Sequence, residues 1–392
     1  MVRFMVMPMM IKIFLLTVAW CGFAFAQEVK PLTAELAKEY DLDPAFYTKT
    51  TFTNGILIAT SDKVSDFAHL EAAYLFDRMM SVIKPEIAQR IREGKVLCLL
   101  VGHNELTSEM PQFKTDKKGK ELAFYNWRSR GFLTLLKGRP TVFFAEEDVM
   151  EYEGGMQRES ILIHEFGHVI HRPGFYEGLD DELMQAWKAA KAKGLWNDAR
   201  AAQRFRRVKS ETPVSLLAAL QKSFPEQPVE LLRKCLDGGD ILVNGKAVKA
   251  DVQVSSKDDV LIVFGGSKRC YAAVNRGEYF AEMVQAWFGT NRTMDHDHNH
   301  IHTREQLKQY DKQGYAFLEK IFINDPWMFV SPRERAGQGH LEGYDPVKAP
   351  KVVEEDFLKE AANDYYDKYW SSYWNRLRIK HGMKPVDEPK DK

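Results

Sequence analysis

The strongest constraint on this chain is the run HEFGH at positions 164–168, an H-E-x-x-H motif within a stretch, 156–171, whose pattern predicts a helix. In a helix with about 3.6 residues per turn, side chains four positions apart lie only about 40° apart around the axis. His164 and His168 therefore project from one face, as two protein ligands of a tetrahedral zinc ion would. Glu165 lies beside them, where its carboxylate can take a proton from a water and pass it to a leaving group. The alternative interpretation is a pair of core histidines.

A third metal ligand must come from elsewhere in the chain. The pattern H-E-x-x-H-x-x-G-x-x-H would require Gly at position 171 and His at position 174, but the chain has His171 and Gly174. Glu278 and Glu282, in the run EYFAE, are four positions apart and so lie on one helical face. One carboxylate can bind the metal while the other accepts the remaining ring N–H of a ligand histidine. The apolar run MVQAWF that follows indicates that this helix packs inward.

Residues 1–26 differ from the rest of the chain. They contain no acidic residue, and their only charged residues are Arg3 and Lys12. The uncharged run that follows ends in AFA, which is typical of a secretory signal peptide cleaved after Ala26. A membrane anchor is the alternative, but this run is shorter than the roughly 20 residues that span a bilayer. We therefore expect a secreted or periplasmic protein whose mature chain has no membrane span.

The overall composition is that of a folded chain with no charge bias. Of its residues, 45% are hydrophobic, enough to form a core. Loss of the two basic residues of the leader leaves 53 of 55 basic residues against 55 acidic ones, a net charge of −2. This charge does not favour nucleic acid or an acidic membrane as a partner. Three cysteines remain, namely Cys98, Cys235 and Cys270, so no disulfide framework is expected.

The pattern along the chain predicts an α+β fold in several parts. We expect an amino-terminal α/β lobe at 27–150, a catalytic core at 151–201 and 267–325, a small inserted α/β module at 202–266, and an aromatic-rich helical extension at 326–392. Strands are predicted at 55–60, 95–101, 141–145, 241–248 (a hairpin with an Asn-Gly turn) and 259–264. Helices are predicted at 214–222, 229–237, 278–288, 304–322 and 354–378.

Together, HEFGH and the later EYFAEMVQAWF resemble the catalytic domain of the anthrax lethal factor-like zinc metallopeptidases, gluzincins related more distantly to thermolysin. The similarity is strongest over 141–200 and 267–322, and 51–113 resembles the amino-terminal half of uncharacterised secreted relatives. It implies a zincin-like fold with a small mixed sheet and an active-site helix. It further implies these roles: Zn²⁺ ligands His164, His168 and Glu278, general base Glu165, Glu282 as partner of a ligand histidine, and Tyr271 as donor to the oxyanion.

The segment 202–266 departs from this resemblance because it separates the two halves of the motif. Its run LLRKCLDGGDILVNGKAV is faintly similar to the small RNA-binding domain of pseudouridine synthases and a ribosomal protein. The segment has 10 basic and 8 acidic residues, and the chain carries a leader. We therefore expect a packing or substrate-gating module rather than an RNA-binding one.

A second conspicuous cluster is DHDHNHIH, which contains His296, His298, His300 and His302. Histidines at period two could bind a second metal, but their alternation is typical of an extended loop. Thr303 and Gln306 directly afterwards match a T-x-x-Q capping box. We favour a structural loop, or one at the rim of the active site, that leads into the next helix.

The expected activity is hydrolysis of a peptide or protein substrate. The strand at 141–145, just before the HEFGH helix, is the candidate to hold an extended substrate by β-augmentation. Two rivals remain open: a catalytically weak binding protein on the same scaffold, and a zinc hydrolase of a non-peptide amide in the cell envelope. The aromatic tail either packs on the catalytic lobe or serves as a platform for a glycan or peptide.

Overall fold

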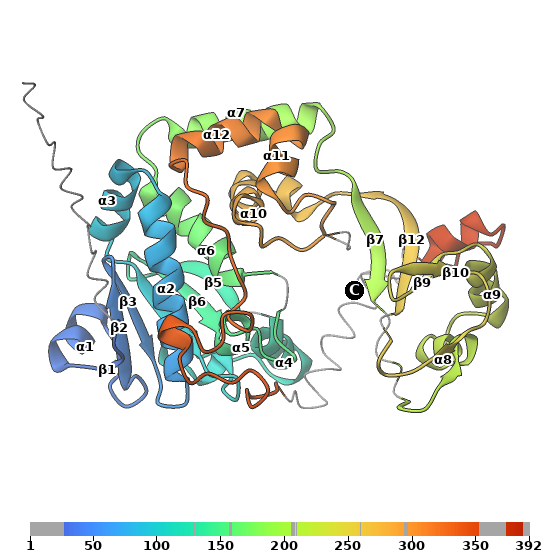
Figure 1. The fold of residues 1–392 in the computed structure, drawn as a ribbon, viewed down its shortest axis with the longest axis horizontal. Coiled ribbons are helices and arrows are strands. Elements are labelled where there is room, and N and C mark those ends of the chain that lie inside the picture. Colours follow the sequence, from blue (N-terminus) through green and yellow to red (C-terminus); the bar gives the residue numbers. More distant parts are fainter. Residues whose placement is uncertain are drawn as a thin grey trace, which may run out of the picture.

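A six-stranded mixed sheet organises the amino-terminal part of the protein (Figure 1). The computed structural model describes residues 27–128, 130–156, 159–204, 208, 210–258, 260–293, 297–352 and 374–386. In spatial order the strands are β1 (Lys30–Pro31), β2 (Lys49–Thr53), β3 (Ile56–Thr60), β4 (Leu97–Val101), β6 (Arg139–Ala145) and β5 (Gly131–Leu136). Strands β3, β4 and β6 are parallel, whereas the other pairs are antiparallel. The predicted α+β class and the three predicted strands of this lobe are confirmed; β5 was not anticipated.

Both faces of this sheet are covered, which explains why its central strands are apolar along their whole length. On one face, alternate residues such as Ile58 and Phe144 pack with α2 (Asp66–Val82) and α6 (Ile161–Val169). On the other face, residues such as Leu99 pack with α1 (Ala34–Tyr40) and the short 3-10 turn η2 (Pro111–Phe113). The remaining helical segments of this half are α3 (Pro85–Glu93), α4 (Gly119–Arg128), α5 (Glu146–Val149) and η1 (Thr107–Glu109).

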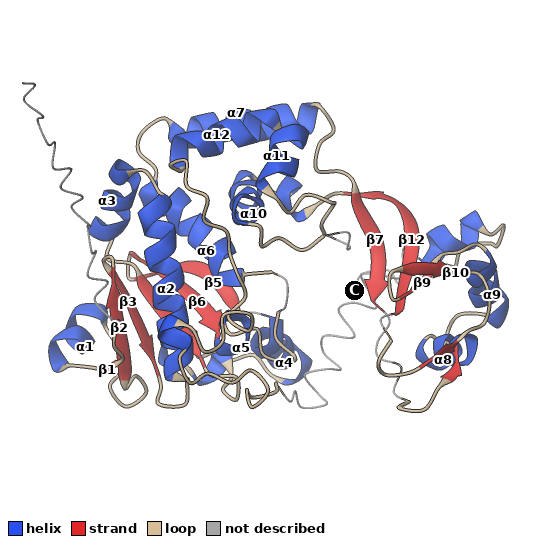
Figure 2. Cartoon of the chain, viewed as in Figure 1, coloured by secondary structure: helices blue, strands red, loops and turns tan. Residues whose placement is uncertain are grey.

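A group of helices lies beyond the sheet (Figure 2). It comprises η3 (Ile170–Gly174), α7 (Leu179–Ala192), η4 (Tyr271–Ala273), α10 (Arg276–Phe288), α11 (Arg304–Tyr310) and α12 (Lys312–Ile321). The single helix predicted at 304–322 is therefore wrong, because the chain breaks at Asp311. The Asp311 carboxylate caps α12 by accepting from Gly314 N, and it also accepts from the Tyr279 hydroxyl and the Trp196 indole. One carboxylate thus accepts from three buried donors at the position where one helix would have continued.

A second, separate core belongs to the module that begins near residue 199. Its elements are β7 (Ala199–Arg204), β8 (Val214–Ser215), α8 (Leu216–Ser223), α9 (Val229–Asp237), β9 (Ile241–Val243), β10 (Lys246–Val248), β11 (Gln253–Val254) and β12 (Val260–Lys268). The hairpin predicted from Asn244-Gly245 joins β9 to β10, and both residues have positive φ, at 50° and 78°. Strand β12 extends beyond 266 and pairs with β7, so the sheet of the module includes residues outside 202–266.

The carboxy-terminal segment divides between the two cores. Over 326–352 it contains only the short η5 (Gly339–Leu341), and its Arg335 and His340 both pair with the buried Glu71 of α2. The helix predicted for this extension, at 354–378, begins after this part. Residues 374–380 are helical, and there Trp374 and Leu377 complete the core of the module.

Several predictions fall outside the described residues, namely the leader at 1–26 and most of the predicted tail helix at 354–378. No helix in the described ranges is long and apolar enough to cross a membrane. Cys98, Cys235 and Cys270 are buried free thiols, as expected for a fold without a disulfide framework.

Candidate metal centre

The HEFGH motif lies on α6, with its apolar side chains against the sheet. The helix begins at Ile161 rather than at 156, because the Ser160 hydroxyl accepts from Ile163 N and caps it. Phe166 is fully buried, and its ring centroid lies 5.1 Å from that of Phe76 on α2. The motif is thereby held by core packing, which leaves the opposite face of α6 for the two histidines.

Gly167 of the motif allows α6 and α10 to approach each other closely. A Cβ atom at this position would lie 3.1 Å from the Cα of Ala281, tighter than nine in ten real Cβ contacts. Two small residues therefore face each other where the helices cross. Because Ala281 lies between Glu278 and Glu282 on α10, this close contact brings both carboxylates next to the histidines.

The three predicted metal ligands converge. One carboxylate oxygen of Glu278 lies 3.1 Å from Nε2 of His164 and 3.3 Å from Nε2 of His168. Donor atoms bound at about 2.0–2.1 Å to a tetrahedral zinc are about 3.3–3.4 Å apart, so these separations fit that ion. The histidine and carboxylate donors also match the chemistry that zinc prefers.

The remaining ring nitrogen of His164 has two partners on α10. Its Nδ1 lies 2.8 Å from Oε1 of Gln285 and 3.4 Å from Oε1 of Glu282. The sequence predicted Glu282 for this role, but the nearer partner is Gln285, which is fully buried. Its amide nitrogen donates in turn to Glu159, 3.3 Å away. Gln285 could have been found from its spacing, since it lies seven positions after Glu278, on the same helical face.

Glu282 connects this site to the histidine-rich loop. It accepts from Asn291 Nδ2 at 3.0 Å, and its Oε2 lies 3.4 Å from Nε2 of His298. Burial pushes the pKa of Glu282 upward, but the charge of His298 and the hydrogen bonds from the two histidines hold it at about 2. The His298 side chain is buried, so this part of the loop is tied into the core beside the site.

The other histidines of the loop do not gather around a second metal in the described residues. The His300 ring packs on Tyr310, whereas His302 N donates to Gln306 at the start of α11. The predicted capping box of Thr303 and Gln306 is confirmed. His296 lies outside the described residues.

Three groups of side chains in the described residues could hold a metal ion. They are His164, His168 and Glu278; Glu159, Glu282 and His298; and Cys235, Asp240 and His381. In the second group Glu159 already pairs with Arg292, and in the third Asp240 pairs with both His381 and Lys380. Two members of the first group, His168 and Glu278, also line a hollow of about 330 Å³, together with Gly131, Phe132, Leu133, Glu165, His171, Arg172 and Tyr271. The first group is the one with both the donor set and space for a ligand.

Glu165 and Tyr271 face this same hollow. Burial raises the pKa of Glu165, although the neighbouring histidines oppose the shift, and its carboxylate accepts from Leu133 N. Burial, together with the nearby carboxylates, also raises the pKa of Tyr271 above its ordinary value, so the hydroxyl keeps its proton and can donate. The ring centroid of Tyr271 lies 6.0 Å from that of His164. The structure thus brings together all six residues predicted for the site.

The predicted substrate strand is wrong. The segment 141–145 lies in β6, which is paired on both sides, by β4 and by β5. Its backbone hydrogen-bonding groups are therefore not free for β-augmentation. Strand β5 instead forms the edge of the sheet and lines the hollow.

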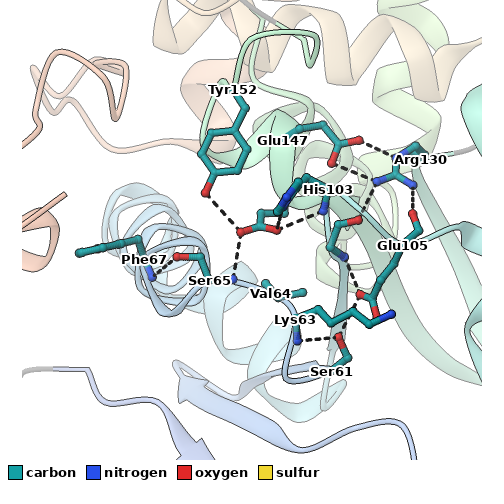
Figure 3. Close-up of polar contacts among 12 residues, drawn as sticks. Ser61, Lys63, Val64, Ser65, Phe67, His103, Glu105, Arg130, Glu147 and Tyr152 are labelled. Carbon is teal, nitrogen blue, oxygen red and sulfur yellow. Dashed lines mark hydrogen bonds and ion pairs between the residues drawn. The ribbon is translucent and has the colours of Figure 1, made fainter. Parts of the chain in front are cut away.

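A buried ionic cluster holds the start of β5 (Figure 3). Nε and Nη2 of Arg130 donate to the two carboxylate oxygens of Glu147 at 2.7 and 3.0 Å, and the other contacts of the guanidinium are with the carbonyls of Glu105 and Gly102. The cluster lies at the carboxyl ends of β4 and β6, one residue before Gly131. Beside it, the hydrogen bond that Nδ1 of His103 donates to Glu146 raises the pKa of His103. The sequence indicated only an acidic run after the strand.

Comparison with protein-family models, curated proteins and solved structures finds no match to this chain.

Proposed function

We propose that this protein is a zinc-dependent metalloendopeptidase with a zincin-like fold, similar to the lethal factor-like peptidases. The observation that carries the proposal is the convergence of His164, His168 and Glu278 at separations suited to tetrahedral zinc. Support comes from Glu165 and Tyr271, which face the same hollow. The leader at 1–26 motivates the further proposal that the protein acts outside the cytoplasm.

The chemistry assigns a distinct task to each residue. A zinc ion held by the three ligands supplies Lewis acidity to a carbonyl and makes water more acidic. Glu165, whose pKa is raised by burial, takes a proton from the attacking water as the oxygen bonds to the carbonyl carbon. It then delivers this proton to the amide nitrogen as the C–N bond breaks, so the products are a carboxylic acid and an amine. Tyr271 donates a hydrogen bond to the oxyanion that develops at the carbonyl oxygen.

The positions of the two histidines are maintained by the residues behind them. Gln285 accepts from Nδ1 of His164, which leaves Nε2 free to bind a metal. Glu282 supports the same ring from a second direction. A substrate would lie along β5, because this strand forms one wall of the hollow and the edge of the sheet.

The test combines metal content with peptide cleavage. We expect one zinc per chain by elemental analysis, and cleavage of an unbiased peptide library by the mature chain. Glu165→Gln should keep the zinc but lower the cleavage rate about 10²- to 10⁴-fold, the usual contribution of a general base. The matched control is Glu86→Gln, an exposed carboxylate in the first turn of α3, which should retain the wild-type rate.

The outcomes separate the rivals. A mature chain without stoichiometric zinc would contradict the metal site. Zinc without cleavage of any peptide would favour the binding protein or the hydrolase of a non-peptide amide. Full activity in Glu165→Gln would remove this carboxylate from the reaction.

A further inference from the structure

The outer edge of β5 offers a regular row of backbone hydrogen-bonding groups. In an antiparallel pair, opposite residues alternately exchange both hydrogen bonds or none. Leu135 lies opposite Pro140, which has no N–H, so this pair is of the kind that exchanges none. By the same alternation, the N–H and C=O groups of Gly131, Leu133 and Leu135 point away from β6. The hydrogen bond from Leu133 N to Glu165 agrees with this direction, so a peptide that pairs with β5 would meet the C=O of Leu133 rather than its N–H.

This row leads from the candidate metal centre to a second hollow. The metal-site hollow contains Gly131, Phe132 and Leu133 at the start of β5. At the end of the strand lies an open hollow of about 650 Å³, which we call the distal hollow. Its lining includes Leu42, Leu135 and Leu136, and the charged residues Lys38, Asp41, Asp43 and Lys137. One strand edge therefore connects the two hollows, and in the described residues no other strand covers this edge.

The distal hollow has the chemistry of a site for an uncharged, apolar group. Its walls include Leu42, Leu136 and Leu135, and the Leu135 side chain is 67% exposed although it is large and apolar. Its charges balance, with two lysines and two aspartates at the rim, of which Lys137 and Asp41 form an ion pair. An exposed leucine in a concave, neutral surface gains by contact with another apolar side chain.

The spacing along β5 determines which substrate residue reaches the distal hollow. Leu136 lies three residues after Leu133, and an extended chain rises about 3.3 Å per residue, so the two positions are about 10 Å apart. A peptide paired with β5 has the same rise. If its scissile bond lies beside Glu165, its third or fourth residue from that bond lies beside Leu135 and Leu136.

We propose that the distal hollow is a substrate subsite, which binds an apolar side chain three or four residues from the scissile bond of an extended peptide. The proposal rests on the proposed peptidase function and adds a specificity that the metal centre cannot supply. Apolar pockets discriminate by about 10- to 200-fold between side chains that differ by one methylene, so we expect about a tenfold preference for apolar side chains at this position. The side of the scissile bond on which the preference lies reports the direction of the bound peptide.

The experiment is digestion of a peptide library, randomised over five positions on each side of the cleavage site, by the full mature chain loaded with zinc. The wild type should favour Leu, Ile, Met or Phe at the third or fourth position by about tenfold over Asp and Lys. Leu135→Glu should remove this preference and raise KM for a long, apolar peptide more than for one that ends short of the hollow. The control Val347→Glu changes an equally apolar, 89% exposed residue of another surface, and should keep the wild-type profile.

The results distinguish this proposal from the one on which it rests. Cleavage with no preference at the third or fourth position would overturn the subsite and leave the peptidase function standing. An unchanged preference in Leu135→Glu would also overturn it, provided that circular dichroism and zinc content match the wild type. Absence of any cleavage by zinc-loaded wild type would overturn both.

Discussion

Replacement of Arg130 by Met should be among the most destabilising single changes in this protein. The guanidinium is 8% exposed, and it makes two hydrogen bonds to Glu147, which is 2% exposed. Its loss leaves a buried carboxylate without its cation, which costs about 3–5 kcal/mol. The carbonyls of Glu105 and Gly102 also lose a donor, which adds to the loss. Because Gly131 follows directly, the start of β5 should loosen and KM for peptides should rise.

The assay is urea unfolding of the metal-free chain, followed by tryptophan fluorescence. The double variant Arg130→Met, Glu147→Leu should recover the part of the loss due to the unpaired charge, but not the part due to the two carbonyls. The control is Lys320→Met, which breaks the exposed pair with Glu182 and should cost about 0–1 kcal/mol. A loss below about 1 kcal/mol for Arg130→Met, similar to this control, would refute the reasoning.

Two further predictions concern Gln285 and His69. Gln285→Leu removes the nearest partner of His164 Nδ1, so we expect the zinc affinity to fall about 10- to 100-fold. Competition with a chelator measures this affinity. An unchanged affinity would mean that Glu282 alone orients the ring. Burial lowers the pKa of His69 from 6.5 to about 4, so between these pH values the unfolded chain binds a proton that the folded chain does not. Stability should therefore fall as the pH drops from 6.5 to 4, by up to about 3 kcal/mol for this group, and the loss should be smaller in His69→Gln. Parallel pH profiles of the metal-free wild type and variant would contradict this assignment.

The structural features that were predictable from the sequence are local ones. The spacing of His164 and His168 is set by the helical repeat, the turn at Asn244-Gly245 by positive φ, and the capping box by two side chains three positions apart. Each depends on only a few neighbouring residues, so the sequence pattern specifies it directly. Long apolar runs such as β4 were equally clear, because strands that are buried on both faces are apolar throughout.

Features that depend on strand order or distant contacts were missed or misplaced. The sequence does not predict β5, and it predicts β6 rather than β5 as the strand that holds a substrate, because no local pattern shows which strand is paired on both sides. The helix predicted at 304–322 breaks at Asp311, whose carboxylate accepts hydrogen bonds from the distant Tyr279 and Trp196. The aromatic tail helix was predicted to pack on the catalytic lobe or to serve as a platform, but Trp374, its one aromatic residue among the described ones, completes the core of the module.

By itself, the sequence determined an α+β chain with two candidate metal ligands on one helix and a predicted partner helix at 278–288. Only the tertiary structure placed Glu278 beside Nε2 of His164 and Gln285 beside Nδ1 of the same ring. It alone also showed that β5 forms the edge of the sheet. The physical reason is that helical periodicity acts over a few residues, whereas His164 and Gln285 are separated by 121 positions. Their contact exists because Gly167 and Ala281 let α6 and α10 pack closely. This close packing depends on the surfaces of both helices, so neither stretch of sequence specifies it alone.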